Sequence, residues 1–163
     1  MSSAQEKIVT SAALVPLLEE ARRQGKKVVF ANGCFDVLHV GHTRYLEAAR
    51  KEGDILVVGV NSDDGVRRLK GPGRPILDEA ARASLVASLR AVSYVVLFAE
   101  LDVEALLKTL CPDVHAKGTD YTAESVPERA TAARLGIRLA IVGDPKQHST
   151  RELLESVRKE LYD

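Results

Sequence analysis

Short apolar runs alternate along the chain with longer segments in which apolar residues recur every three or four positions. Each run has the length and the β-branched content of a strand that is buried on both faces. Five runs are predicted as strands: Lys27–Ala31, Ile55–Val60, Tyr94–Phe98, Val114–Lys117 and Ile137–Val142. The segments between them have helical spacing, so the pattern predicts a regular alternation of strands and helices.

Helices are predicted around these strands from their spacing and from their start and stop residues. They cover about Ser11–Gln24, Gly41–Gly53, Asp78–Ala91, Asp102–Leu110, Val126–Leu135 and a last helix that Ser149 or Thr150 caps and that ends near Glu160. Ser11 is expected to cap the first helix, Pro16 to lie in its first turn, and Gly25 to stop it. The stretch Asn61–Pro75 is interpreted as a polar connecting segment.

Alternation of strands and helices indicates an α/β protein with a parallel sheet and helices on both faces. Right-handed crossovers then give a doubly wound, five-stranded parallel sheet of Rossmann-like form. Ligands of such sheets bind beyond the carboxyl ends of the strands, where the strand order reverses. The length of 163 residues fits one domain, residues 1–163, with residues 1–26 as an N-terminal helical extension packed on it.

The charge is balanced, with 23 basic and 23 acidic residues, so nothing indicates a nucleic-acid or membrane-surface partner. No apolar run reaches the about 18 residues that a membrane-spanning helix needs. The first ten residues lack the apolar region of a signal peptide, and a cytoplasmic location is expected. Cys34 and Cys111 are too few for a disulfide framework, and Cys34 is expected to be a small packed residue.

The stretch Lys27–Arg50 carries the strongest indication of function. A buried strand and the turn residues Asn32 and Gly33 lead to His39 and His42, three positions apart at a helix start. This spacing puts both imidazoles on one side of the first turn, where N–H groups and the helix dipole favour a phosphate. Two imidazoles there can stabilise the charge that develops during phosphoryl transfer. The alternative is one capping and one packed histidine.

The segment Gly33–His42 has the form G-x-F-D-x-x-H-x-G-H, which resembles the signature of the cytidylyltransferase-like nucleotidyltransferases. Enzymes of that family move a nucleoside monophosphate from a nucleoside triphosphate onto a phosphate and release pyrophosphate. The resemblance implies a Rossmann-like nucleotidyltransferase fold and catalytic roles for His39 and His42. It also implies contacts with the nucleotide for five further residues: Asn32, Gly33, Phe35, Asp36 and Gly41.

A basic segment, Arg67–Pro75, follows the second predicted strand and contains four cations among glycines and prolines. Cations on a flexible loop can close over a triphosphate and neutralise it, although a solvated surface loop is the alternative. Its form R-L-K-G-x-x-R-P is similar to the corresponding loop of the bacterial heptose 1-phosphate adenylyltransferases. This resemblance implies a catalytic role for Lys70 and sugar-phosphate binding by Arg68 and Arg74.

The segment Lys117–Tyr121 follows the fourth predicted strand and resembles the K-G-G-D-Y of the heptose enzymes, except at its third position. Lys117 is expected to reach a phosphate and Asp120 a ribose or base amine, and the alternative is a strand-ending turn. Arg82 matches an arginine of the family and is expected to touch the nucleotide, unless it is a surface arginine. His115, a lone histidine in a strand, is expected to be structural.

Ser149 and Thr150, at the start of the last predicted helix, are expected to bind the β and γ phosphates through hydroxyl and N–H groups. They resemble the family's second signature, in which a second threonine is common at the position of Arg151. The cytidylyltransferase form also carries R-T-x-G just upstream. This chain has Asp144–Gln147 there, which argues against that subgroup.

The resemblance as a whole implies an adenylyltransferase that transfers AMP from ATP to D-glycero-D-manno-heptose 1-phosphate, giving ADP-heptose for lipopolysaccharide synthesis. Mg2+ is expected to enter with the nucleotide, with no dedicated metal site on the protein. The expected partners are these small-molecule substrates and further copies of the chain in a homo-oligomer such as a dimer. Two alternatives remain open: a cytidylyltransferase acting on glycerol 3-phosphate or another phosphate acceptor, and a non-catalytic nucleotide-binding regulatory module. A dinucleotide-binding domain is disfavoured because no G-x-G-x-x-G follows the first strand.

Overall fold

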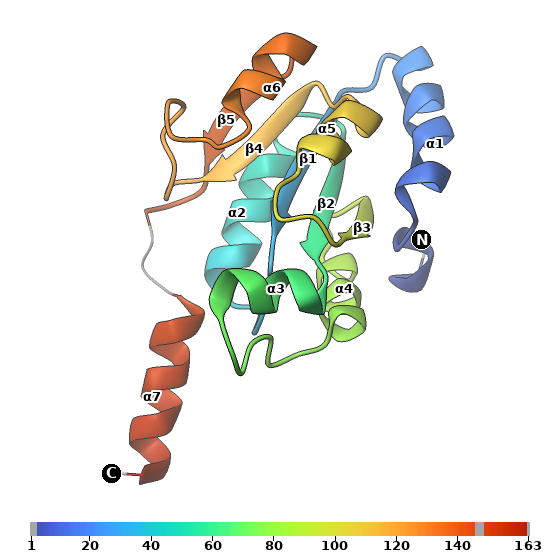
Figure 1. Ribbon diagram of the computed structural model, residues 1–163. Coiled ribbons are helices and arrows are strands. Elements are labelled where there is room, and N and C mark those ends of the chain that lie inside the picture. Colours follow the sequence, from blue (N-terminus) through green and yellow to red (C-terminus); the bar gives the residue numbers. More distant parts are fainter. Residues whose placement is uncertain (1–2, 146–148, 163) are drawn as a thin grey trace.

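Five parallel strands form a sheet of order β3-β2-β1-β4-β5 (Figure 1). The structure is a computed structural model that describes residues 3–145 and 149–162. The strands are β1 (Val28–Gly33), β2 (Ile55–Asn61), β3 (Tyr94–Phe98), β4 (Val114–Gly118) and β5 (Arg138–Val142). The predicted α/β class and the five-stranded parallel sheet are therefore confirmed.

Helices cover both faces of this sheet (Figure 1). They are the short 3-10 helix η1 (Gln5–Lys7), α1 (Ser11–Arg23), α2 (Val40–Arg50), α3 (Asp63–Lys70), α4 (Glu79–Ala87), α5 (Glu104–Leu110), α6 (Arg129–Leu135) and α7 (Thr150–Tyr162). Leu46 of α2 and Val86 of α4 belong to one apolar core. Leu14 of α1 and Leu107 of α5 belong to the other. Successive residues of a strand point to opposite faces, so β1 contributes to both cores.

The strand order reverses between β1 and β4. The chain runs outward from β1 through β2 to β3 and then returns to the other side of β1 for β4 and β5. Phe30 of β1 pairs with His115 of β4 in the parallel register. The carboxyl ends of these two strands therefore form the edge at which doubly wound sheets bind ligands.

The start of α1 differs from the prediction. Thr10, not Ser11, is the N-cap, because its Oγ1 accepts a hydrogen bond from Ala13 N at 3.2 Å. Pro16 lies beyond the first turn, inside the helix. A proline there removes one helical hydrogen bond. Leu14 and Leu18 are fully buried, so tertiary packing holds the helix despite that loss.

The interpretation of Asn61–Pro75 as a connecting segment is wrong in its first half, which forms α3. Ser62 caps this helix by accepting a hydrogen bond from Gly65 N at 3.1 Å. The helix begins with two aspartates and ends with basic residues, which suits its dipole. Arg67, Arg68 and Lys70 therefore lie on the last turn of a helix and not on a flexible loop.

Four other helices are shorter than predicted. α2 ends at Arg50, α4 ends at Ala87, α5 begins at Glu104 and α6 begins at Arg129. α7 begins where it was expected, because Ser149 Oγ accepts a hydrogen bond from Glu152 N and Ser149 N donates to Glu152 Oε2. This reciprocal arrangement is a capping box. Within residues 3–145 and 149–162, none of the helices is both long and apolar enough to cross a bilayer.

Candidate active site

The loop after β1 is tightly folded. Phe35 and Val37 have φ angles of 50° and 55°, which place both in the left-handed region that side chains other than glycine rarely adopt. A Cβ atom on Gly33 would lie 3.0 Å from the Phe35 ring, so a larger residue would push this ring aside by a few tenths of an ångström. The loop holds strained backbone in a fixed shape, a feature that gathers at functional sites.

His39 and His42 lie together at the start of α2. Gly41 N donates to His39 Nδ1 at 3.1 Å, and His39 N donates to His42 Nδ1 at 3.3 Å. Their rings stack, with centroids 3.8 Å apart, and the rings of Phe35 and His42 form a T-shaped pair. Because both Nδ1 atoms accept, a neutral ring of either histidine carries its proton on Nε2. The arrangement thus presents two Nε2–H donors from one helical turn.

The sequence predicts that Asp36 contacts the nucleotide, but in the structure its carboxylate contacts other groups of the protein. Its buried carboxylate accepts hydrogen bonds from Arg74 Nε at 2.9 Å and from the backbone N–H groups of Ile76 and Leu77. Burial acts to raise the pKa of Asp36, but these hydrogen bonds and the Arg74 charge outweigh it and hold the pKa below its ordinary value. Asp36 and Arg74 therefore fasten the loop before α4 to the loop after β1, which is called the motif loop below.

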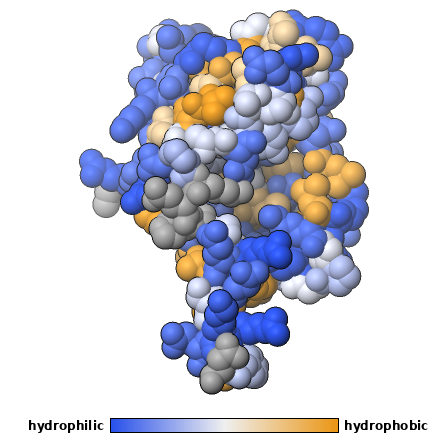
Figure 2. Space-filling model, turned by 90° about the vertical axis from the view of Figure 1, so that its left-hand side faces the viewer, coloured by the Kyte–Doolittle hydropathy of each residue, from blue (hydrophilic) through white to orange (hydrophobic). Residues whose placement is uncertain are grey.

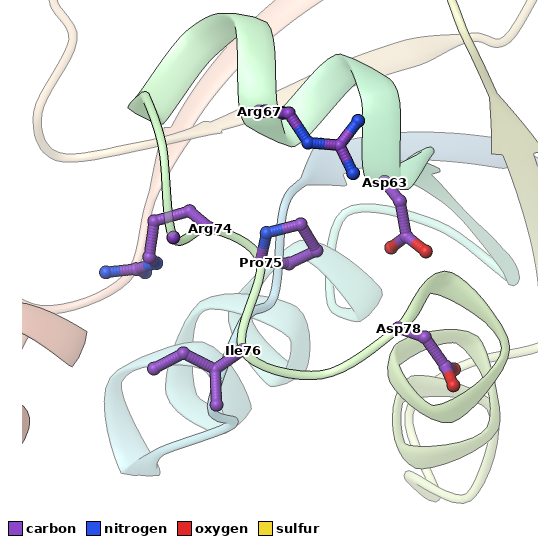
Figure 3. A pocket seen from close by; sticks show the side chains of 7 residues that line it. Asp63, Arg67, Arg74, Pro75, Ile76 and Asp78 are labelled. Atoms are coloured by element: carbon purple, nitrogen blue, oxygen red, sulfur yellow. The ribbon is translucent and has the colours of Figure 1, made fainter.

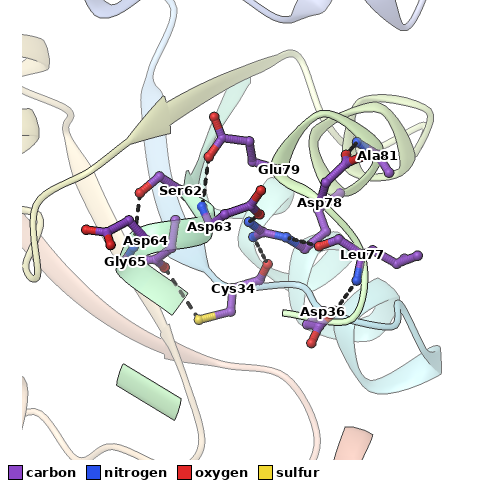
Figure 4. A network of polar contacts seen from close by, with 12 residues as sticks. Cys34, Asp36, Ser62, Asp63, Asp64, Gly65, Leu77, Asp78, Glu79 and Ala81 are labelled. Atoms are coloured by element: carbon purple, nitrogen blue, oxygen red, sulfur yellow. Dashed lines mark hydrogen bonds and ion pairs between the residues drawn. The ribbon is translucent and has the colours of Figure 1, made fainter. Parts of the chain in front are cut away.

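Arg82 is also placed differently from the expectation. Its side chain is fully buried and donates to Leu77 O, Cys34 O and Asp63 Oδ1. Figure 4 shows this network, in which residues of α3, α4 and the loop after β1 converge. The guanidinium thus holds three segments of the protein together.

A pocket of about 360 Å³ lies between α3, the following loop and the start of α4 (Figure 3). Its lining consists of Asp63, Arg67, Gly73, Arg74, Pro75, Ile76 and Asp78. The lining carries both acidic and basic groups, and it does not include the histidine pair. The ion pair of Arg74 with Asp36 connects the pocket wall to the motif loop.

The carboxyl end of β4 carries a second group of polar residues. Lys117 Nζ lies 3.4 Å from Asn32 Oδ1, 3.8 Å from Glu128 Oε2 and 4.6 Å from the centroid of the Tyr121 ring. Burial lowers the pKa of Lys117, and the charge of Glu128 opposes that effect. The structure thus brings two predicted nucleotide-binding residues, Asn32 and Lys117, into contact. Asp120 lies on the exposed turn beyond them.

The two signatures of the sequence meet at Thr150. Its Oγ1 donates to the backbone carbonyl of Asp36 at 2.8 Å, so the start of α7 adjoins the loop after β1. Arg151, which stands where a second threonine is common, is exposed and pairs with Glu155. Lys146, Gln147 and His148 lie outside the described residues.

The basic residues of α3 diverge. Arg68 donates to Ala99 O and pairs with Asp64, which directs it towards the end of β3. Lys70 is exposed at the last position of the helix, and its charge acts on the Cys34 thiol. Burial raises the pKa of Cys34, and Lys70 and Arg82 oppose this effect only in part, which agrees with a packed thiol.

Some residues that shape the site had no signal in the sequence. Glu128 is buried beside Lys117, and Asp63 holds the Arg82 guanidinium. Both are acidic residues at helix starts, a pattern that also occurs on open surfaces. His115, by contrast, is fully buried against Phe30 and Glu128, as expected for a structural histidine. Within the part of the chain that the structure describes, no three His, Cys, Asp or Glu residues form a metal-binding group.

Comparison with known proteins gives consistent results. The family model described as cytidylyltransferase-like matches residues 30–157. Bifunctional protein HldE of Syntrophotalea carbinolica is 46% identical over 151 residues, which are 93% of this chain and 31% of that protein. Bifunctional protein HldE of Geobacter metallireducens is 44% identical over 156 residues, 96% of this chain and 32% of that protein. The chain thus spans about a third of the length of these relatives.

Two solved structures are similar in fold. The lipopolysaccharide core biosynthesis protein from Thermoplasma volcanium superposes with a TM-score of 0.65 at 29% identity, covering 75% of this chain and all of that one. Pantothenate synthetase from Thermus thermophilus gives a TM-score of 0.63 over 94% of this chain and 70% of that one. Its identity is 20%, so this second likeness concerns the fold alone.

Proposed function

The chain belongs to the cytidylyltransferase-like family, and we propose that it is an adenylyltransferase that transfers AMP from ATP to a sugar 1-phosphate and releases pyrophosphate. The stacked pair of His39 and His42 carries this proposal, because it offers two Nε2–H donors at a helix start. The basic segment and the Lys117 turn resemble the heptose enzymes, which favours D-glycero-D-manno-heptose 1-phosphate as acceptor and ADP-heptose as product. Similarity to a lipopolysaccharide core biosynthesis protein supports a role in lipopolysaccharide synthesis.

The reaction is an in-line displacement at the α-phosphorus of ATP. An oxygen of the sugar phosphate forms the new P–O bond while the bond to the bridging oxygen of the β-phosphate breaks. The attacking phosphate is already ionised at neutral pH, so no general base is needed. Catalysis then consists of positioning and charge neutralisation. His39 and His42 donate Nε2–H to the phosphate oxygens on which charge accumulates.

The remaining cations surround the phosphates. Lys70 lies at the end of α3, next to Gly71, and moves over the triphosphate when ATP binds. Thr150 and the start of α7 adjoin the motif loop and hold the outer phosphates. Arg74 lines the pocket beside Asp36 and binds the acceptor phosphate there. Arg68 donates to Ala99 O and would have to leave this contact to bind the sugar phosphate.

Mg2+ accompanies ATP as part of the substrate. The carboxylates of Asp36 and Asp63 already accept hydrogen bonds from Arg74 and Arg82. A hard cation that keeps several waters and binds triphosphate oxygens needs few protein ligands. When bound, Mg2+ neutralises charge on the leaving pyrophosphate. Because ATP is the nucleotide, we place the reaction in the cytoplasm.

The same family membership also fits a cytidylyltransferase or a nucleotide-binding regulatory module. The absence of R-T-x-G before Ser149 and the form of the basic segment favour ATP over CTP. Phosphate-binding residues see the same triphosphate in every nucleotide, so the choice of base depends on groups near the ends of β4 and β5. A site that leaves groups unpaired with the wrong base discriminates by a few kcal/mol, at about 1.4 kcal/mol per tenfold.

We also propose that the chain forms a homodimer through α7, which projects from the body of the molecule (Figure 2). None of its described residues is buried, and Leu153, Val157 and Leu161 form an apolar stripe at intervals of four. When a second copy covers an apolar stripe of this kind, the stripe leaves water, and this burial stabilises the dimer. Sedimentation velocity of Val157→Glu beside the unchanged chain tests this, with a shift from dimer to monomer expected and equal masses contradicting it.

A matrix of substrates tests the proposed function. ATP, CTP, GTP and UTP are each combined with heptose 1-phosphate, glycerol 3-phosphate and glucose 1-phosphate, and pyrophosphate release is measured. We expect the highest kcat/KM for ATP with heptose 1-phosphate. Preference for CTP with glycerol 3-phosphate would establish the cytidylyltransferase alternative. Nucleotide binding without pyrophosphate release from any pair would establish the regulatory module.

A further inference from the structure

Three ionisable side chains are buried together near the carboxyl ends of β1 and β4. His115 and Lys117 stand two positions apart on β4, and Glu128 lies immediately before α6. They are 0%, 5% and 4% exposed, respectively. Glu128 Oε2 lies between the other two, 3.4 Å from His115 Nε2 and 3.8 Å from Lys117 Nζ. Buried charges persist only when they are paired, so this cluster requires an electrostatic account.

Both ring nitrogens of His115 face acceptors. Nδ1 lies 3.3 Å from the carbonyl oxygen of Phe30, and Nε2 lies 3.4 Å from the Glu128 carboxylate. A neutral imidazole has a single N–H, so either neutral form would set a lone pair against an oxygen. The contacts are complete only when both nitrogens carry a proton. The geometry therefore favours a ring with both nitrogens protonated beside an ionised Glu128.

Glu128 keeps its charge although it is buried. Burial acts to raise its pKa, but the hydrogen bond from His115 and the charge of Lys117 outweigh burial and hold the pKa below its ordinary value. With both His115 nitrogens protonated, the carboxylate has two cationic neighbours. One of the two then balances it, and the cluster as a whole retains one positive charge.

We propose that the contacts of His115 hold it as an imidazolium that neutralises Glu128, so that the ammonium of Lys117 keeps an uncompensated positive charge for the phosphates of the nucleotide. His115 is thus a positioning residue that acts through Glu128 and touches no substrate, because it is fully buried. Without it, Glu128 would cancel the charge of Lys117. The inference rests on the proposed function, since it takes a nucleoside triphosphate as the ligand at this edge.

The position of Lys117 supports the proposal that its charge is available to the nucleotide. Its Nζ also contacts Asn32 Oδ1 at the end of β1, on the edge where the strand order reverses. The Tyr121 ring covers the ammonium and attracts it as a cation. Glu128 and Asn32 hold the long side chain in one place, so a ligand that binds Lys117 does not have to order it. The charge is both fixed and directed to the edge of the sheet.

Binding of a non-hydrolysable ATP analogue, measured by calorimetry, tests the proposal with three variants. His115→Leu leaves Glu128 to cancel Lys117, and Kd should rise about tenfold, as expected for the loss of one near charge. Glu128→Gln removes the carboxylate, His115 then releases its proton, and the charge of the cluster is unchanged. Its Kd should therefore rise clearly less than that of His115→Leu, although Lys117 loses the carboxylate that helps to hold it. The double variant His115→Leu/Glu128→Gln should recover most of the loss.

Recovery in the double variant separates charge from packing. If His115 acted only by filling space, adding a second core change would weaken binding further. Thr131→Val provides the matched control, because it alters a buried residue of α6 without changing charge, and its Kd should not move. Unchanged binding in His115→Leu, or a double variant weaker than His115→Leu, would overturn the proposal.

A second readout does not depend on the nucleotide. The 15N NMR signals of the His115 ring, measured on the free protein near neutral pH, should show that both ring nitrogens are protonated. In Glu128→Gln the same signals should show a neutral ring. A neutral His115 ring in the unchanged chain would contradict the charge arrangement by itself. If the chain bound no nucleotide while the doubly protonated ring was observed, the proposed function would fail and the charge arrangement would stand.

Discussion

The buried guanidinium of Arg82 lies 2.9 Å from the Asp63 carboxylate, which joins the start of α4 to the start of α3. The same side chain donates to the carbonyl of Cys34 in the loop after β1. A fully buried cation thus connects three segments that are separate in sequence. The shape of the loop after β1 therefore depends on α4.

We expect Arg82→Leu to lower the free energy of unfolding by about 3 kcal/mol, because it leaves Asp63 and two buried carbonyl groups without their partner. Urea denaturation measures the change. The matched control is Arg67→Leu on α3, an exposed cation whose loss should change stability by at most about 1 kcal/mol. Equal stability of the two variants would show that the buried network carries no such role.

Asp36 should make stability depend on pH on the acid side. Its pKa in the folded chain lies below the ordinary value of 3.8, so its contribution is fully present above that value. The contribution is lost as the pH falls through the folded-state pKa. Asp36→Asn should cost about 2 kcal/mol at neutral pH and progressively less below 3.8. A cost that does not change with pH would contradict this account.

The sheet could be predicted from sequence because its strands are short apolar runs buried on both faces, as in β2 and β3. The helix ends were less accurate because caps depend on single side chains, as with Thr10 in place of Ser11. The helix α3 was missed because Val66 and Gly65 are its only buried residues, and its other positions are polar. So small an apolar face does not stand out from a loop.

The histidine pair of the candidate site could be predicted because His39 and His42 are close in sequence and share one helical turn. The positions of Arg82 and Glu128 could not be predicted. A charged residue near a helix start is normally solvated, and its burial depends on partners distant in sequence, such as Cys34 for Arg82. The roles of Asp36 and Arg74 likewise depend on the fold of the loop between α3 and α4.

The histidine pair should act in the transition state more than in binding. His39→Ala or His42→Ala should lower kcat by roughly 10²–10³, the range for loss of one donor to a developing charge. The Kd for ATP should change much less. Because Nδ1 of each ring accepts a backbone N–H group, circular dichroism and unfolding must accompany the kinetics to exclude a capping defect. Turnover close to the original in both variants would remove the pair from the mechanism.

Lys70 should become protected when nucleotide binds. It is exposed and precedes Gly71, whose φ of 91° marks the end of α3. We expect trypsin to cut after Lys70 in the free chain and much more slowly with ATP and Mg2+. Lys70→Ala should lower turnover and remove this cleavage. The bond from Arg74 to Pro75 resists trypsin in either state and does not confuse the measurement. Equal rates of cleavage after Lys70 with and without nucleotide would contradict closure of this segment over the triphosphate.

Transfer of the adenylyl group is the central claim, and the fate of the α-phosphorus tests it most directly. The chain is incubated with heptose 1-phosphate and ATP labelled either at the α- or at the γ-phosphorus, and the products are separated. We predict that the α-label appears in the nucleotide sugar and that the γ-label appears in pyrophosphate. A γ-label in the sugar product, or no transfer of the α-label to any sugar phosphate, would contradict the account.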